Sequence, residues 1–167
     1  MQIDQVPAPT PEERQLAMEL AAAALAEVAP DELEEFDEIS EEYFADPAAA
    51  LTTGGRDQPL AFGGEEIALL APYVLTAAVP VVQWLGGLLA DGAKEAATPW
   101  VAERIRSIIR KWRGGQREQP VPAHALSLEH GRTAWGITHD RLRELNVPEE
   151  QARQIADSVL GALVVGR

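Results

Sequence analysis

The feature that most constrains this chain is a stretch of 24 successive residues, Ile67–Ala90, without an acidic or basic side chain. About 20 apolar residues can cross a bilayer as a helix. A helix that is apolar all round must otherwise be buried inside the protein. Pro72, Pro80 and the pair Gly86-Gly87 lie within the stretch. Proline costs ~3 kcal/mol in a soluble helix interior, and bilayer helices tolerate it better.

Three interpretations of this stretch stay open. In the first it is a transmembrane helix, with Tyr73 and Trp84 as interfacial aromatics. In the second it is the core of a soluble helical domain, as one helix or as a hairpin broken at Pro80 or Gly86-Gly87. In the third it inserts reversibly, being buried while covered and membrane-bound when released. Few other large apolar residues are present to build a core, which favours the second.

Charge is unevenly distributed along the chain. The formal net charge is −13, and residues 1–66 carry a net −15, residues 67–113 a net +3 and residues 114–167 a net −1. An acidic protein repels phosphates, so we expect no nucleic-acid partner. The absence of cysteine excludes disulfides and thiolate chemistry. The first residues lack the pattern of a secretory signal. These features predict a cytoplasmic location, free or on the inner face of a membrane.

A basic amphipathic helix is predicted directly after the uncharged stretch, over Thr98–Arg113. Thr98-Pro99 is a typical helix start. At helical spacing, an apolar stripe faces away from most of the basic residues. Such a helix is typical of membrane interfaces, and each base adds ~1 kcal/mol near anionic lipid. A core-facing helix with a solvated basic face is the alternative. The candidate membrane or partner interface comprises Trp100, Arg104, Ile105, Arg106, Ile108, Arg110, Lys111, Trp112 and Arg113.

Two helices are predicted in the acidic N-terminal third. Thr10-Pro11 with Glu13 forms a capping box for a helix that reaches Ala29. A second helix spans Asp31–Ala45, and the small Ala-rich faces of the pair can wrap a central apolar helix. Nine acids between Asp31 and Asp46 form either a solvated face or a docking surface for a basic partner, such as the chain's own basic helix. The apolar stripe of the second helix comprises Leu33, Phe36, Ser40, Tyr43 and Phe44.

A glycine-rich loop is predicted at residues 51–66. It lacks the Lys-Ser or Lys-Thr of a phosphate-binding loop. Arg56 lies within it, and exposed loop tips of this composition are common sites of proteolysis. Arg56 is therefore the candidate cleavage site.

The C-terminal part, residues 127–167, is predicted to be a helical hairpin after a linker at 114–126. Ser127 caps a helix that reaches Leu145, with Leu128, Trp135, Leu142 and Leu145 on its apolar face. Asn146-Val147-Pro148 ends it, and so short a break predicts an antiparallel pair. The face of the final helix comprises Ala152, Ile155, Ala156, Val159, Leu160 and Leu163.

The predicted fold is therefore all-α, since no stretch shows the alternation of a strand. It has five parts: an acidic helical pair (1–50), the glycine-rich loop (51–66), the apolar segment with the basic helix (67–113), the linker (114–126) and the hairpin (127–167). The central apolar segment is either a helix or a helical hairpin.

No residues suggest an enzyme. His124, His130 and His139 lack the i, i+4 spacing of a helical metal site. The four serines stand in no nucleophile motif. The carboxylates lie on predicted solvated faces rather than in apolar pockets that raise a pKa. We expect no metal, no cofactor and no small-molecule substrate.

The segment LRELNVPEEQARQIADSVLGAL, residues 142–163, resembles small helical segments of bacterial conflict-system proteins. In such systems short helical proteins accompany proteases, caspase-like enzymes or signalling ATPases. The resemblance implies a role as adaptor or effector with a protein partner, and it transfers no functional residue.

Three hypotheses follow. The first is a non-enzymatic helical adaptor or effector whose central segment associates with or inserts into an anionic membrane. Its acidic third would shield the basic helix, and its hairpin would recruit a protein partner. The second is a soluble protein-interaction module with residues 67–90 as its core. The third is an antitoxin-like acidic protein that neutralises a basic toxin.

Overall fold

The computed structural model of the protein describes residues 8–56, 69–89, 99–109 and 126–165. Every regular element in these ranges is a helix, so the predicted all-α fold is confirmed. The elements are α1 (Pro11–Val28), the 3-10 helix η1 (Pro30–Glu35), α2 (Phe36–Ala45), α3 (Pro47–Arg56), α4 (Ala71–Leu89), α5 (Pro99–Ile108), α6 (Leu128–Glu144) and α7 (Glu149–Gly161).

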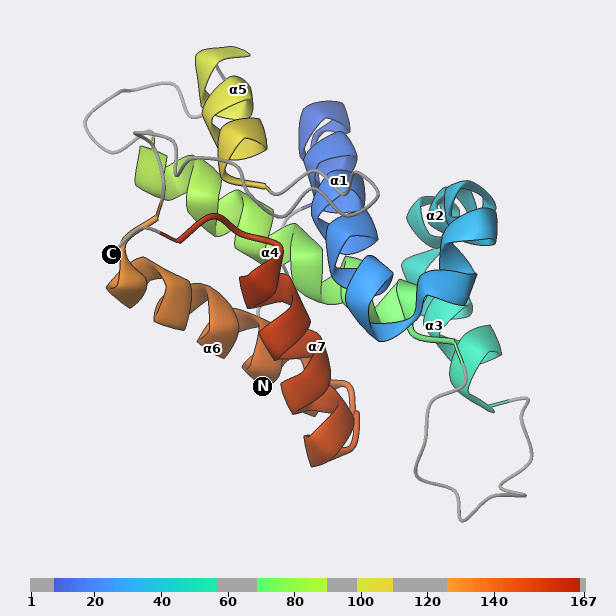
Figure 1. The fold of residues 1–167 in the computed structure, drawn as a ribbon. Helices are drawn as coiled ribbons and strands as arrows, with labels where there is room; N and C mark the ends of the chain where they lie inside the picture. Colours follow the sequence, from blue (N-terminus) through green and yellow to red (C-terminus); the bar gives the residue numbers. More distant parts are fainter. Residues whose placement is uncertain (1–7, 57–68, 90–98, 110–125, 166–167) are drawn as a thin grey trace, which may run out of the picture.

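Residues Ala71–Leu89 of the uncharged stretch form one central helix, α4 (Figure 1). α1 and α6 flank it, α2 and α3 contact its N-terminal end, and α5 contacts the other end. Neither Pro80 nor Gly86-Gly87 interrupts the helix, so the hairpin alternative is wrong. Pro72 lies in the first turn of α4, where its missing N–H leaves no helical bond unmade.

α1 lies close against α4 because its inner face is rich in alanine. The predicted capping box is present: Thr10 Oγ1 accepts from the Glu13 N–H at 3.1 Å, and Glu13 Oε1 accepts from the Thr10 N–H at 2.9 Å. Small side chains let two helix backbones approach, so α1 covers one whole side of α4. The buried residues of α1 are Leu16, Ala17, Leu20, Ala21, Ala24 and Leu25.

The acidic region after α1 differs from the prediction at two places. The predicted single helix begins as η1, and only from Phe36 is it an α-helix. A 3-10 turn is common where a helix starts, here at Pro30. The first part of the predicted loop at 51–66 is helical, because α3 extends to Arg56. Asp46 caps this helix by accepting the Ala49 N–H at 3.1 Å, and Pro47 begins it.

The predicted hairpin of α6 and α7 is present, and hydrogen bonds between backbone groups fix its turn. Asn146 adopts a left-handed conformation with φ 63°, which asparagine tolerates better than most residues. The Val147 N–H donates to the Leu142 carbonyl and the Asn146 N–H to the Arg143 carbonyl, both at 3.0 Å. These two bonds make a Schellman motif that ends α6.

The buried face of α6 agrees with the prediction only towards its C-terminal end, where Leu142 is buried. Leu128 is 57% exposed and Trp135 is only half-buried. The residues that face inward are Gly131, Ala134, Thr138 and Leu142. A Cβ atom on Gly131 would lie 3.1 Å from Leu160 Cδ1. α6 therefore approaches α7 too closely for large side chains, and small residues form the contact.

A short extended segment after α7, Leu163–Val165, returns to the end of α5. We call this segment the strap. Leu163 pairs with Ile109, and Val165 pairs with Leu126, as isolated β-bridges. No strand pattern in the sequence predicts this, since each bridge involves single residues rather than an alternating run.

The close approach of α6 predicts different responses at its two glycines. A Cβ at Gly136 meets nothing within 4 Å, whereas at Gly131 it meets both Leu160 and Val165. We expect Gly136→Ala to raise the free energy of unfolding by about 0.5–1 kcal/mol through its helix propensity. Gly131→Ala should give no gain or a loss. Urea unfolding of the two variants tests this, and equal gains at both sites would contradict the geometry.

Candidate functional site

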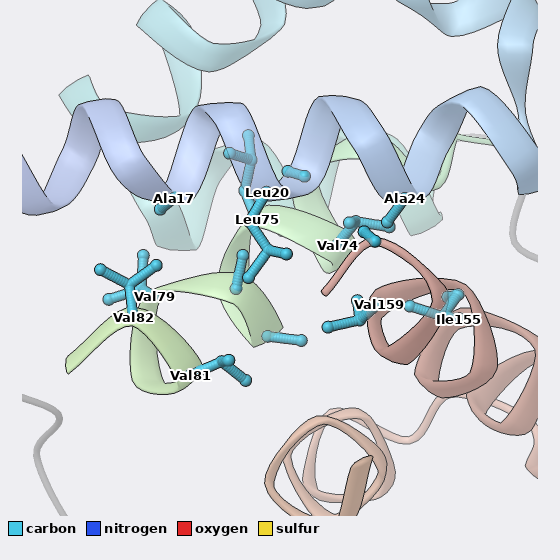
Figure 2. Close-up of a cluster of buried hydrophobic side chains, with 14 of the residues drawn as sticks. Ala17, Leu20, Ala24, Val74, Leu75, Val79, Val81, Val82, Ile155 and Val159 are labelled. Carbon is cyan, nitrogen blue, oxygen red and sulfur yellow. The ribbon is translucent and has the colours of Figure 1, made fainter. Parts of the chain in front are cut away.

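The candidate site is α4 with the elements that cover it. All nine residues of Ala71–Val79 are buried, so this half of the helix is covered on every side. Figure 2 shows Leu20 of α1 beside Leu75 of α4, with Val159 and Ile155 of α7 in the same buried cluster. Among the helices in the described ranges, α4 is the one long and apolar enough to cross a membrane. The same length and composition fit a core helix.

The N-terminus of α4 is held by a carboxylate from η1. Glu32 Oε2 accepts the Leu70 N–H at 3.0 Å, and its Oε1 accepts the Ala71 N–H at 2.8 Å. Leu69 and Leu70, which precede the helix, offer no side-chain acceptor of their own. Glu32 thus supplies a remote N-cap, and its negative charge also interacts favourably with the helix dipole.

Polar contacts inside α4 are few and satisfied. Thr76 Oγ1 donates to the Pro72 carbonyl at 2.7 Å. The hydroxyl of Tyr43 in α2 is hydrogen-bonded to the Thr76 side chain, while burial raises the pKa of Tyr43 above its ordinary 10.0. Pro80 has no N–H to offer the Thr76 carbonyl, so the helical ladder lacks one bond in its middle.

α5 places its apolar stripe in the core. Ile105 is 2% exposed and Ile108 is 0% exposed, so in this state neither side chain is available to a membrane. Arg106 Nε lies 3.3 Å from Glu19 Oε2 of α1, while Arg104 is exposed. The Trp100 side chain and residues Arg110, Lys111, Trp112 and Arg113 lie outside the described part of the chain.

The acidic surface of residues 31–46 lies away from α5, so it is not the docking surface for the chain's own basic helix that was one of the two alternatives. Of the nine acids between Asp31 and Asp46, eight are exposed to solvent and the ninth, Glu32, caps α4. α2 and α5 contact opposite ends of α4 (Figure 1). Within the described ranges, the ion pair that joins the acidic third to α5 is Arg106–Glu19, and Glu19 belongs to α1.

Arg56 is the last residue of α3 rather than part of an irregular loop. Its side chain and residues 57–68 lie outside the described ranges. Cleavage after Arg56 stays a prediction, and it requires the end of α3 to fray, because proteases bind extended backbone.

A polar cluster on the α6–α7 hairpin was not predicted. The rings of Trp135 and His139 stack at 4.8 Å with an interplanar angle of 10°. Trp135 Nε1 donates to Asp157 Oδ1 at 2.7 Å, and His139 Nε2 lies 3.0 Å from Glu149 Oε1. Arg153 Nε also donates to Glu149 at 2.9 Å. The i, i+4 spacing of Trp135 and His139 is the sequence signal for the stack. The Trp135–Asp157 and His139–Glu149 contacts connect α6 to α7, whereas the stack and the Arg153 bond lie within one helix each.

No arrangement in the described ranges brings together three or more side chains that could hold a metal ion. Comparison with protein-family models, with curated proteins and with solved structures found no match to this chain.

The remote cap gives a direct prediction for Glu32. Glu32→Ala should lower the free energy of unfolding by about 1–2 kcal/mol, because two N–H groups and the helix dipole lose their partner. Glu32→Gln, with one acceptor oxygen and no charge, should lose part of this. The matched control is the exposed neighbour Glu34→Ala, expected to change stability by less than about 0.5 kcal/mol. Equal effects at 32 and 34, measured by urea unfolding, would refute the cap.

The hairpin cluster predicts an acid-dependent loss of stability. The hydrogen bond from His139, with a further bond from Arg153, holds the pKa of Glu149 below its ordinary 4.5. A carboxyl whose pKa is lower in the folded protein stabilises it above pH 4.5, and this contribution is lost as the pH falls through the folded value. Urea unfolding at pH 7 and near pH 3 should therefore show a smaller acid loss for Glu149→Gln than for the unaltered protein. Glu150→Gln is the control on the same turn and should behave like the unaltered protein.

Proposed function

We propose that this chain is a non-enzymatic helical effector that keeps α4 as the core of a soluble form and delivers it, together with α5, to an anionic membrane. In this function the exposed α6–α7 hairpin is the surface that meets a protein partner. The bundle of α1, α2, α3, α6 and α7 acts as the cover of α4.

The observation that supports this function is the way in which α4 is held. α4 has no charged side chain, and its charged tie to the cover is the Glu32 carboxylate on its backbone N–H groups. A helix with its backbone groups bonded internally can enter a bilayer without leaving polar groups unsatisfied. Release of α4 therefore exposes apolar surface, which water disfavours and hydrocarbon accepts.

α5 supplies the charge that a membrane surface attracts. It follows α4 in the chain and contacts its C-terminal end. Arg104 and Arg106 lie on the side away from the core, and each basic residue near anionic lipid contributes ~1 kcal/mol. For Ile105 and Ile108 to reach the acyl region, α5 must turn away from α1 and α4, which also breaks the Arg106–Glu19 pair.

A soluble interaction module is the second candidate. Twelve of the 19 residues of α4 are buried, which is the normal state of a core helix in a soluble protein. The hairpin carries a half-buried tryptophan, Trp135, among charged side chains, and such residues often anchor protein interfaces. In this function α4 never leaves the bundle.

A fluorophore on α4 distinguishes the two functions. The chain has no cysteine, so a single introduced thiol is labelled uniquely. Gly87→Cys is suitable because Gly87 is exposed and a Cβ there meets nothing within 4 Å. We expect spin-labelled lipids in phosphatidylglycerol vesicles to quench this label. In pure phosphatidylcholine vesicles, which attract no basic residue, the quenching should be much weaker.

The control carries the label at Glu34→Cys, on the solvated acidic face, and should stay unquenched in both lipids. Both labelled proteins are also measured with the additional substitution Glu32→Ala, which weakens the cap of α4. If the Gly87 label is quenched in neither background, and the protein stays a cooperatively unfolding soluble species, the membrane function is excluded and the interaction module stands.

A further inference from the structure

The strap, Leu163–Val165, joins two segments that are far apart in the chain. The Val164 N–H donates to the carbonyl of Ile108, the last residue of α5, at 2.6 Å. The Val164 carbonyl accepts the N–H of Leu126 at 3.0 Å. One residue thus uses both of its backbone groups to connect the end of α5 to the start of the hairpin.

The strap is also buried at its apolar contacts. Leu163, Ile109 and Leu126 are all buried where the bridges form. Val165 lies directly against α6, since its two methyl groups are 3.2 and 3.3 Å from the Cβ position of Gly131. The strap therefore fills a space that no other described residue occupies.

The strap adds a backbone contact to the side-chain packing that holds α5 in place. A helix of ten residues is marginal in water without tertiary contacts. α5 packs on α1 and α4 through Ile105 and Ile108. Its ion pair with Glu19 is partly exposed, at 38% and 27% for the two side chains, and solvent screening leaves such a pair with little net stabilisation. Within the described ranges, the backbone bond that reaches α5 from another element is the one from Val164.

We propose that the strap is a latch that caps the C-terminus of α5, and that its detachment frees the basic helix while the rest of the bundle stays folded. The carbonyls in the last turn of a helix lack partners within the helix, and Val164 satisfies one of them. Leu163–Val165 can peel away without moving α7, because the strap lies beyond the last residue of that helix. Only the binding of the freed α5 to a membrane rests on the proposed function.

The first test removes the latch bond. Val164→Pro deletes the N–H that Ile108 accepts, whereas Val164→Ala keeps it and trims the side chain. Hydrogen–deuterium exchange measures the opening of each helix. Loss of one such bond should speed exchange in Ile105–Ile108 about tenfold in Val164→Pro, with α1 and α7 unchanged. Val164→Ala should have a clearly smaller effect.

The second test closes the latch and compares two redox states of one protein. In a disulfide each Cβ lies about 3 Å from the partner sulfur, which is close to the separation of the Val165 methyl groups from the Gly131 Cβ position. In Gly131→Cys/Val165→Cys, oxidation should slow exchange in α5 about tenfold relative to the reduced form of the same protein. The reduced form controls for the added side chains.

The outcomes separate the latch from the membrane function. Unchanged exchange in α5 between the oxidised and reduced double-cysteine protein, or equal changes in α1 and α5, would overturn the latch. Flotation of both forms with phosphatidylglycerol vesicles is measured in parallel, and the reduced form should bind several-fold more. If α5 exchanges faster in the reduced form but neither form binds vesicles, the latch is kept and the membrane function is rejected. If both forms bind vesicles equally and α5 exchanges equally in both, the latch is rejected and the membrane function is kept.

Discussion

The structure depends on one constraint, which is that the N-terminal half of α4 needs cover on all sides. A helix with an apolar stripe can face water on its other side, but α4 has no polar face to present, and residues Ala71–Val79 are buried throughout. Several surrounding helices are needed to cover it, and the chain supplies them from both sides along the sequence. α1 comes from the acidic third, and α6 comes from the C-terminal hairpin. The bundle exists as a unit because none of these elements alone can cover the helix.

Within this bundle, the N-terminus of α4 and the C-terminus of α5 are capped by residues that lie far away in the chain. α4 is preceded by leucines, and its N–H groups are satisfied by Glu32 of η1. α5 ends at Ile108, whose carbonyl is satisfied by Val164 after α7. In α1, by contrast, the capping box is local, through Thr10 and Glu13. The two helices of the candidate site therefore depend on distant elements for interactions that most helices obtain from neighbouring residues.

Local patterns in the sequence predicted the helices whose faces are made of large residues at regular spacing. The stripe of α2, with Phe36 and Tyr43, and the face of α7, with Ile155 and Val159, are buried as expected. The face of α6 was predicted correctly at Leu142 and wrongly in its first half, because Gly131 and Ala134 form the contact there and Leu128 does not. Spacing alone cannot show how closely two backbones approach.

Of the candidate site, the sequence predicted α4 and the basic helix, and it did not predict the interactions that hold them. Glu32 looks like one acid among nine, and its role depends on a contact with residues 38 and 39 positions away. Val164 is a single apolar residue whose importance lies in its backbone groups rather than its side chain. Neither role leaves a periodic or compositional trace, because each is created by tertiary placement.

The placement of charge connects the cap of α4 to the acidic surface around it. Seven exposed acids share η1 and α2 with Glu32, and an eighth, Asp46, follows directly. Like charges at this density repel one another across solvent. The element that holds the N-terminus of α4 thus lies in a segment with a high density of like charge. Salt weakens repulsion between exposed charges over a Debye length of about 8–10 Å, but it affects a partly buried hydrogen-bonded contact much less. A basic partner on this surface would therefore relieve the repulsion and tighten the cap of α4, although it would contact neither α4 nor α5.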